Sequence, residues 1–342
     1  MRIAALTVSY PNLSESFVRR EFEGLQARGH DVVAFVKREP GGPFPVASSV
    51  EARTWTDDAL RAFAPDVIYA SLGAPAHVRA RDAACLLRVP YVLRVWEGYD
   101  AFCHPSPGFY AEAVRDPRCR AIVLEDEWMR AYAAAEMAIT GKVRIVPNGV
   151  DTDTFTPAEA PHDGPVRVLA IARWVAKKGL RHLCAAFRAL RPGNAELVLI
   201  GYGPEEDQLR AAAGVNTGIT FRPPIPPDQL AAEYQAADIF VAPCVAPKGG
   251  DADGVPTTVL EAMACGLPVI GSTLHSMPLY VTNGACGLLT PPGDERAIEQ
   301  ALSALIGNGD VRRIMGRNAR EAVLARFALS AALDGLEAVL AD

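Results

Sequence analysis

The sequence predicts an α/β protein with two doubly wound, mainly parallel sheets, each in a domain of its own. Short apolar runs with little polar alternation recur along the chain, as in strands that are covered on both faces. Segments of helical period separate these runs, which is typical of parallel strands joined by crossover helices. The pattern stops at residues 147–165, a stretch rich in Pro, Asp, Thr and Gly, and then starts again. A length of 342 residues also suits two domains.

The first domain is predicted over residues 1–150. After the first apolar run, residues 15–28 have helical period and direct Phe17, Phe22 and Leu25 toward a core. The stretch that follows provides a turn and a second strand. The segment 28–36 provides this turn and strand. Further strands are predicted at residues 3–8, 67–70, 91–95, 121–124 and 143–146.

The second domain is predicted over residues 151–325, and the closing stretch from about residue 294 to residue 341 reads as helical. Ligands of doubly wound sheets bind beyond the carboxyl ends of the strands. We therefore expect functional residues directly after strands. The strands of this domain are predicted at residues 166–172, 196–200, 218–221, 238–243 and 268–272.

Composition excludes several classes of protein. A net charge of −6 and a pI near 5.6 argue against a general nucleic-acid binder. No apolar run approaches the roughly 18–20 residues that a transmembrane helix needs, and the amino-terminal stretch becomes polar too soon for a secretory signal. The seven cysteines are scattered and form no CxxC pair, so neither a zinc site nor a disulfide framework is indicated. These features predict a cytoplasmic protein.

The first candidate motif is IARWVAKKGL at residues 171–180, which follows a predicted strand directly. The planar guanidinium of Arg173 and the point charge of Lys178 suit a diphosphate. A basic turn that is merely exposed to solvent is the alternative.

The second motif, LIGYGPEEDQL at residues 199–209, begins like a dinucleotide-binding fingerprint. However, Glu206 stands where the third glycine belongs, and no acidic residue follows about 20 residues later. The GYG sequence therefore predicts a tight strand-to-helix turn at which a ligand approaches the backbone. Nicotinamide chemistry is not expected.

The third motif, DADGVPTTVLEAMACGLPVIGS, places Asp253 and Glu261 with seven residues between them. Thr257 or Thr258 can cap a helix that begins near Val259, and the N–H groups of that helix start form an anion site. Glu261 can then reach ribose hydroxyls, while Asp253 faces whatever the phosphate carries or only caps the loop. Together, the three motifs predict a site for a nucleoside diphosphate sugar.

These motifs resemble those of the family-4 retaining glycosyltransferases, which have the GT-B fold. PNGVDTDTF (147–155) is similar to that family's linker loop, RWVAKKG to its Arg-x4-Lys-Gly element, GYGPEEDQL to its glycine turn, and residues 253–272 to its signature of two acidic residues separated by seven others. Near the front, PNLSESFVRREFEGLQARGHDV is similar to the bacterial exopolysaccharide and lipopolysaccharide group 1 enzymes. The resemblance spans nearly the whole chain. It implies two Rossmann-like domains that face each other across a cleft, with residues 326–342 crossing back onto the first domain.

The resemblance implies a role for each matching position. Arg173 and Lys178 would hold the diphosphate, Glu261 would bind the ribose, and Ile225 would lie near the base. Backbone groups of residues 254–259 would hold phosphate and sugar. The implied donor-binding residues are Arg173, Lys178, Gly201, Ile225, Asp253, Gly254, Val255, Pro256, Thr257, Thr258, Val259 and Glu261. The implied catalytic residues are Glu97, Asp253, Arg173 and Lys178, and those on the acceptor side are Asn12, Ser14, Tyr99 and Asp100.

Two positions depart from the family's pattern. Asp253 is one methylene shorter than the usual glutamate, which contacts the donor sugar. Glu97 stands in place of a histidine, at the start of a segment that usually reads His-Gly-x-Asp. An ionised glutamate accepts hydrogen bonds, which favours a cationic partner such as an amino sugar, or a hydroxyl-rich one. Alternatively, Glu97 is structural and pairs with Arg94 or another basic residue.

The implied reaction moves a sugar from a UDP- or GDP-linked donor to an acceptor hydroxyl with retention at the anomeric carbon. Neither a metal nor another cofactor is expected, because the Asp-x-Asp sequences at 151–153 and 251–253 lie inside motifs of this family. The acceptor would be a glycan, a lipid-linked sugar or a small natural product, with at most peripheral contact to the inner face of the membrane. Two alternatives remain: a nucleotide-sugar epimerase or hydrolase on the same fold, and a non-catalytic protein that binds the donor.

Overall fold

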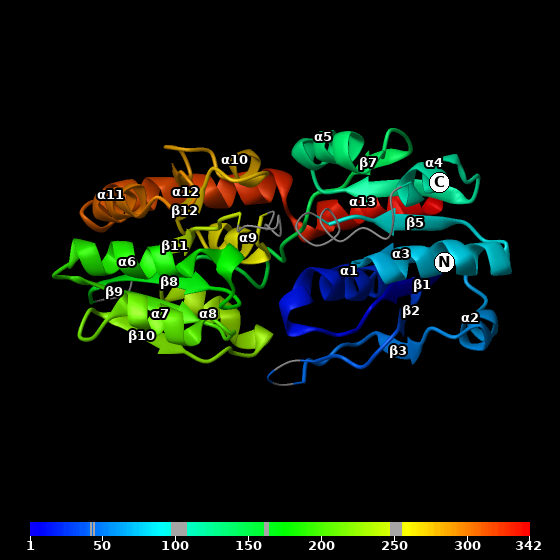
Figure 1. Cartoon of the computed structure of the whole chain (residues 1–342), viewed down its shortest axis with the longest axis horizontal. Coiled ribbons are helices and arrows are strands. Elements are labelled where there is room, and N and C mark those ends of the chain that lie inside the picture. Colours follow the sequence, from blue (N-terminus) through cyan, green and yellow to red (C-terminus); the bar gives the residue numbers. More distant parts are fainter. Residues whose placement is uncertain (42, 44, 97–107, 161–163, 247–254) are drawn as a thin grey trace. The chain divides into compact units, whose positions relative to one another are not determined.

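The computed structural model describes residues 1–41, 43, 45–96, 108–160, 164–246 and 255–342. Its internal contacts divide the chain into two compact units, residues 1–149 together with 329–342, and residues 150–328. The sequence predicts these divisions after residues 150 and 325. Each unit is an α/β domain with one parallel sheet, so the predicted fold class is confirmed (Figure 1).

The sheet of the first unit has seven parallel strands in the order β3-β2-β1-β4-β5-β6-β7. The order reverses between the hydrogen-bonded neighbours β1 and β4, which makes their carboxyl ends the switch point of this sheet. The sequence does not predict β3, because EART is a mostly exposed edge strand without an apolar run. The other strands lie at the predicted apolar runs. The strands are β1 Arg2–Thr7, β2 Asp31–Val36, β3 Glu51–Thr54, β4 Val67–Ser71, β5 Tyr91–Arg94, β6 Cys119–Leu124 and β7 Val143–Ile145.

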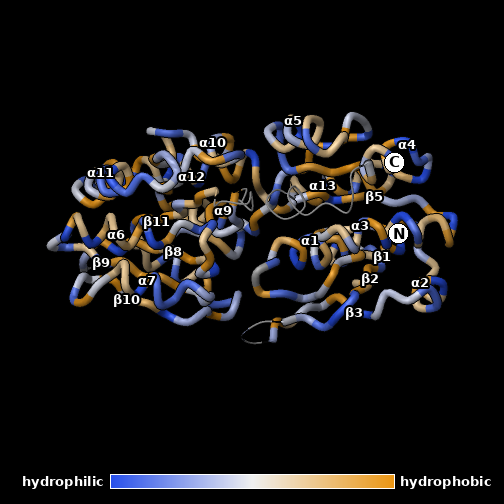
Figure 2. The backbone as a smooth tube through the Cα atoms, viewed as in Figure 1, coloured by the Kyte–Doolittle hydropathy of each residue, from blue (hydrophilic) through white to orange (hydrophobic). Residues whose placement is uncertain are grey.

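Helices surround this sheet and bury its apolar strands, and Figure 2 shows hydrophobic residues along the strands and polar residues on the outer turns of the helices. In α1, the predicted core residues Phe22 and Leu25 are fully buried. The helices are α1 Ser16–Ala27, α2 Asp57–Phe63, α3 Ala74–Leu87, α4 Phe109–Arg115, α5 Glu127–Glu136 and the terminal α13 Leu329–Ala341.

The terminal helix α13 is part of the first unit, where it packs against α1. Leu333 of α13 lies so close to Gly24 of α1 that a Cβ at Gly24 would be 2.5 Å from its Cδ1. Beside this apolar contact, Arg28 donates to Glu337 at 2.5 Å, and His30 Nε2 lies 2.6 Å from the other oxygen of Glu337. The carboxyl-terminal segment is therefore held by apolar packing and by charged hydrogen bonds.

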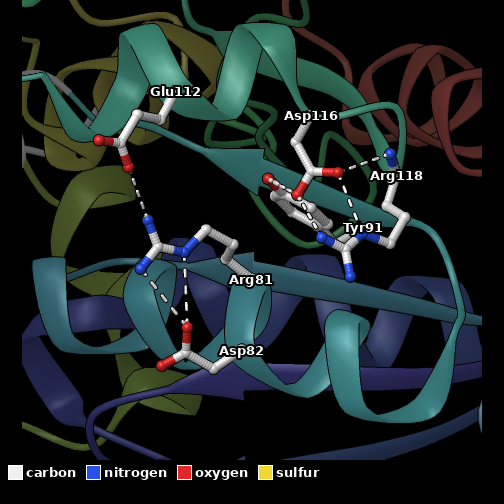
Figure 3. A network of polar contacts seen from close by, with 6 residues as sticks. All are labelled: Arg81, Asp82, Tyr91, Glu112, Asp116 and Arg118. Carbon is white, nitrogen blue, oxygen red and sulfur yellow. Dashed lines mark hydrogen bonds and ion pairs between the residues drawn. The ribbon is translucent and has the colours of Figure 1, made fainter.

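A network of polar contacts braces the amino edge of this sheet (Figure 3). Arg81 of α3 donates to Glu112 of α4 at 3.1 Å. Next to it, Asp116 accepts from Arg118 at 3.0 Å and from the hydroxyl of Tyr91 at 3.3 Å. Partial burial acts to raise the pKa of Asp116, but the bonds from Arg118 outweigh it and hold the pKa below its usual range. This network lies at the edge of the sheet opposite the carboxyl ends of the strands, where ligands bind in such folds. We therefore give it a structural role.

The sheet of the second unit has six parallel strands in the order β10-β9-β8-β11-β12-β13. Its switch point lies between β8 and β11, which are hydrogen-bonded neighbours. The sequence does not predict the edge strand β13, because GLLT has only two apolar residues, between a glycine and a threonine. The strands are β8 Val166–Ile171, β9 Ala195–Ile200, β10 Ile219–Arg222, β11 Ile239–Ala242, β12 Val269–Ser272 and β13 Gly287–Thr290.

The closing stretch of the chain is helical as predicted, with breaks between α11 and α12 and between α12 and α13. None of the helices in the described ranges combines the length and the apolar composition that crossing a bilayer requires. The helices of the second unit are α6 Leu180–Leu190, α7 Glu206–Ala213, α8 Leu230–Gln235, α9 Thr257–Ala264, α10 Met277–Tyr280, α11 Glu295–Ile306 and α12 Gly309–Arg326.

Candidate functional site

A pocket lies at the switch point of the second sheet, where the sequence predicts the phosphate site. It is shallow: its empty space is about 220 Å³ when open solvent is counted, and about 10 Å³ of this can hold the centre of a water-sized molecule. The ends of β8 and β11, the loop after β8 and the start of α9 all contribute to its wall. Three of the predicted donor-binding residues, Lys178, Pro256 and Thr258, therefore come together here. The lining residues are Ile171, Ala172, Lys178, Leu180, Val241, Ala242, Pro243, Cys244, Pro256 and Thr258.

The loop after β8 is held against the loop after β11 by backbone contacts. Val245 N donates to Lys177 O at 2.9 Å, and Lys178 N donates to Val175 O at 3.0 Å within a turn of 3-10 helix. Gly179 then has a φ of 65°, and a Cβ there would lie 2.1 Å from Pro243 O. Only glycine therefore allows both this left-handed conformation and the close approach that places Lys178 at the pocket.

Replacing Gly179 by alanine should destabilise the second unit by about 2–5 kcal/mol, as the sum of about 1–2 kcal/mol for the left-handed conformation and about 1–3 kcal/mol for the forced displacement of the Pro243 carbonyl. Urea unfolding of the whole chain measures this loss. Gly193→Ala is the matched control, because no atom lies within 4 Å of a Cβ there and its φ is not left-handed. A loss of similar size in the two variants would contradict the role given to Gly179.

Arg173 directly follows the end of β8 and has an exposed side chain. Its carbonyl accepts from Val175 N at 3.0 Å, while its guanidinium makes no hydrogen bond or ion pair with any residue that the structure describes. Its neighbour Trp174 is buried and packs edge-on against Phe221 with ring centroids 5.8 Å apart. The backbone at Arg173 is thus anchored next to a buried residue, and contact of its guanidinium with a diphosphate stays a prediction.

The GYG turn after β9 supports this loop through its backbone. Trp174 N donates to Tyr202 O at 2.7 Å, and Glu205 N donates to Trp174 O at 3.1 Å. A Cβ at Gly201 would lie 1.9 Å from Ala172 O. The space that a side chain would fill is therefore occupied by protein backbone, and Gly201 does not line the pocket. Contact of Gly201 with a donor stays a prediction.

The start of α9 differs from the sequence prediction. The helix begins at Thr257, its N-cap is Pro256, and no side chain caps it, so the prediction that Thr257 or Thr258 caps a helix starting near Val259 was wrong. The reason is that Pro256, with φ −58° and ψ 138°, already sets the extended entry, which lets the helix start two residues earlier. The positive end of the α9 dipole nevertheless borders the pocket, because Pro256 and Thr258 line it.

Glu261 lies in the second turn of α9 and is 1 % exposed. The hydroxyl of Tyr234 donates to its Oε2 at 2.7 Å. The apolar residues around it form the core beneath the carboxyl edge, and the partly buried Ile225 packs against that same core. Neither Glu261 nor Ile225 lines the pocket, so their contacts with ribose and base stay predictions.

Asn12 and Ser14, which are predicted on the acceptor side, follow β1. Asn12, after β1, donates to Ser9 Oγ at 2.6 Å and to Glu15 Oε2 at 2.9 Å, so it holds its own loop together. Ser14 lies in the 3-10 helix Leu13–Glu15. Glu97, Tyr99, Asp100, Asp253 and Gly254 lie outside the described residues.

The structure reveals a buried ion pair in the first unit that sequence reasoning missed. Arg94, at the end of β5, is fully buried; its Nη1 donates to Val146 O at 2.6 Å and its Nη2 lies 3.5 Å from Glu21 Oε1. The hydroxyl of Tyr69 donates to the other oxygen of Glu21 at 2.5 Å. Burial raises the pKa of Glu21, and Arg94 and Tyr69 oppose that shift. The available signal was an arginine inside the apolar run YVLRV, and the described partner of Arg94 is Glu21.

The described part of the chain offers no cluster of His, Cys, Asp or Glu that could hold a metal ion. Asp151, from the first Asp-x-Asp sequence, instead accepts hydrogen bonds from the backbone of Asp153 and Thr154 at 3.0 and 3.1 Å. It therefore stabilises a turn.

Two family models match the chain. Residues 14–154 match the model described as Glycosyltransferase Family 4. Residues 165–308 match the model described as Glycosyl transferases group 1. The two models meet close to the division between the two units.

Curated relatives are similar to parts of the chain. The amylovoran biosynthesis glycosyltransferase AmsK of Erwinia amylovora is 33% identical over 178 residues, which cover 50% of this chain and 44% of that protein. The GDP-mannose-dependent alpha-(1-6)-phosphatidylinositol monomannoside mannosyltransferase of Mycobacterium tuberculosis is 30% identical over 237 residues, 65% of this chain and 60% of that protein. The chain spans about half the length of the curated relatives it matches.

Among solved structures, Anabaena HepE, crystallised in complex with UDP and glucose, superimposes with a TM-score of 0.80 at 17% identity, and the match covers 100% of both chains. At this identity the likeness shows the fold, which is the GT-B architecture of two Rossmann-like domains.

Proposed function

Since the chain belongs to the group 1 glycosyltransferases of the GT-B fold, we propose that it transfers a sugar from a nucleoside diphosphate sugar to an acceptor hydroxyl with retention at the anomeric carbon. The observation that carries the proposal is the pocket between β8 and β11. Lys178 and the start of α9 both line it, so a cationic residue and the positive end of a helix dipole meet there, and the exposed Arg173 lies in the same loop as Lys178.

These groups suit a departing nucleoside diphosphate. Negative charge develops on the leaving phosphate as the bond to the anomeric carbon breaks, and fixed positive groups at that position lower the barrier. The two cations then have different roles. The guanidinium of Arg173 orients two phosphate oxygens, and the ammonium of Lys178 neutralises a third.

Retention is proposed through substitution on the front face. The acceptor oxygen bonds to the anomeric carbon on the side from which the phosphate leaves, and the acceptor proton passes to a phosphate oxygen of the departing group. No described residue lining the pocket is an aspartate or glutamate that could form a covalent intermediate. The protein then contributes positioning and charge stabilisation, without a metal or another cofactor.

The donor nucleoside is uridine or guanosine, and the acceptor is a sugar of a growing glycan or lipid-linked glycan. The names of similar proteins support this: HepE was crystallised with UDP and glucose, AmsK is named for amylovoran biosynthesis, and the mycobacterial relative is named for GDP-mannose and a phosphatidylinositol monomannoside. The reaction would take place in the cytoplasm, with at most peripheral membrane contact. A small amine-bearing molecule is the alternative acceptor, because an ionised Glu97 on the acceptor side would favour a cationic partner.

A thermal-shift series with UDP, GDP, UDP-glucose and GDP-mannose tests donor binding, because a ligand at 100 times its Kd stabilises the folded state by about 2.7 kcal/mol. NMR of the glycoside formed with lipid-linked and free sugar acceptors, in the presence of EDTA, then gives the anomeric configuration and the need for metal. An inverted product would contradict the mechanism. Free sugar or an epimer without acceptor would indicate a hydrolase or an epimerase, and binding without any product would indicate a non-catalytic protein.

A further inference from the structure

The loop of residues 272–276, which joins β12 to α10, has features that packing does not explain. The hydroxyl groups of Ser272 and Ser276 are buried and have no hydrogen-bond partner among the described residues. Between them, His275 has a φ of 48°, in the left-handed region. Buried hydroxyls without a partner are uncommon, and residues in such backbone conformations gather at functional sites.

The loop is nevertheless anchored at both ends. Thr273 N donates to Thr290 O of β13 at 2.9 Å, and Met277 N donates to Leu274 O at 3.1 Å. These backbone contacts hold His275 in its left-handed conformation, which would otherwise be unfavourable for a residue other than glycine.

The register of the sheet brings the first residue of this loop beside a residue that lines the pocket, although residues 272–276 do not line it themselves. Ala242 of β11 pairs with Gly271 of β12. One residue further along the two strands come Pro243, which lines the pocket, and Ser272. The loop thus leaves the same carboxyl edge, on the side of the pocket away from β8.

The order of the strands, combined with the roles that the resemblance implies for Ile225, Arg173 and Lys178, places the donor sugar on this side. Along the carboxyl edge the strands follow one another as β10, β9, β8, β11 and β12. Ile225, proposed near the base, follows β10, while Arg173 and Lys178, proposed at the diphosphate, follow β8. A donor laid along the edge with its base toward β10 and its diphosphate at β8 and β11 has its sugar toward β12.

We propose that residues 272–276 select the donor sugar, with His275 as a specificity-determining residue. This inference rests on the proposed function. An imidazole and two hydroxyl groups both donate and accept hydrogen bonds, which is the chemistry that sugar hydroxyls require. Ser272 and Ser276 then complete their hydrogen bonds through the sugar or through a water that bridges to it.

Isothermal titration of His275→Gly and Ser276→Ala with UDP, GDP, UDP-glucose and GDP-mannose tests the inference. We expect the Kd of the diphosphates to change less than about twofold, and the Kd of the sugar nucleotide that the wild-type protein prefers to rise at least about tenfold, since a lost hydrogen bond to a hydroxyl is of that size. His275→Gly should also keep or raise the Tm, because glycine adopts this φ without strain.

Asn216→Gly is the matched control. Asn216 also has a left-handed φ, 54°, and precedes β10 at the amino edge of the same sheet. This variant should leave the Kd of all four ligands unchanged.

The outcomes separate the two proposals. An unchanged sugar preference in both variants, or an equal weakening of diphosphates and sugar nucleotides, overturns the role of the loop while the proposed function stands. Wild-type protein that binds none of the four probes overturns the proposed function and this inference with it.

Discussion

Replacing Arg94 by methionine should lower the free energy of unfolding by about 3–5 kcal/mol, because it leaves the carboxylate of Glu21 buried without its counter-charge. The side chain of Arg94 is fully buried and that of Glu21 is 10 % exposed, so water cannot replace the missing partner. Chemical unfolding monitored by tryptophan fluorescence measures the loss.

The loss should be smaller at about pH 5 than at about pH 8. The pKa of Glu21 is already raised by burial, and removing Arg94 raises it further. A carboxyl with a raised pKa in the folded state destabilises that state as pH rises above its unfolded value, and the penalty is relieved when the group takes up a proton.

Two further variants make this prediction specific. The double variant Glu21→Leu, Arg94→Met should recover most of the loss, because an apolar replacement of both partners leaves no buried charge. Arg144→Met is the matched control, since Arg144 pairs with Asp342 at 3.9 Å and the two side chains are 52% and 67% exposed. That exposed pair should contribute no more than about 1 kcal/mol. A loss in Arg94→Met no larger than in the control would show that the buried pair adds no stability.

Replacing Lys178 by alanine should lower kcat by about 10²–10³-fold, as the loss of one preorganised group that stabilises developing charge does in other enzymes. The donor phosphate carries most of its new charge in the transition state, so kcat should fall more than KM rises. Steady-state kinetics with the donor and acceptor identified by the binding series measures both constants.

Lys178→Arg and Arg181→Ala serve as comparisons. Arginine keeps the charge but not the compact ammonium, so Lys178→Arg should retain part of kcat. Arg181 lies in the first turn of α6 with an exposed side chain and does not line the pocket, so its loss should change kcat by less than about threefold, in line with screening of exposed charges. If Lys178→Ala raised KM and left kcat unchanged, Lys178 would contribute to binding of the ground state and not to stabilisation of the transition state.

Secondary structure was predictable wherever a segment is buried on both faces. The inner strands of both sheets consist of apolar residues because helices cover them, and this leaves an unmistakable pattern. The edge strands β3 and β13 were not predicted, because EART is mostly exposed and GLLT has only two apolar residues. The N-cap of α9 was predicted wrongly because a side-chain acceptor usually marks this position, and Pro256 has none.

The site was predictable in part, since Lys178, Pro256 and Thr258 were predicted and line the pocket. Lys178 follows a strand, and so its place at the carboxyl edge follows from topology. Pro243 and Cys244, which also line the pocket, carry no chemical signature in the sequence. Likewise, the pairing of Glu21 with Arg94 joins residues 73 positions apart, counted as 94 minus 21, and depends on where α1 crosses the sheet.

The sequence by itself determined the two α/β units, the strands at their centres and the loops that carry charge to the carboxyl edge, because local hydrophobic period and glycine positions encode these directly. Only the tertiary structure decided which atoms meet: that Gly179 admits the carbonyl of Pro243, that Gly201 faces protein backbone, that Glu261 is buried under Tyr234, and that His275 stands between two hydroxyls without partners. Such contacts depend on the register of neighbouring strands and on close packing between segments distant in sequence, which no local pattern records.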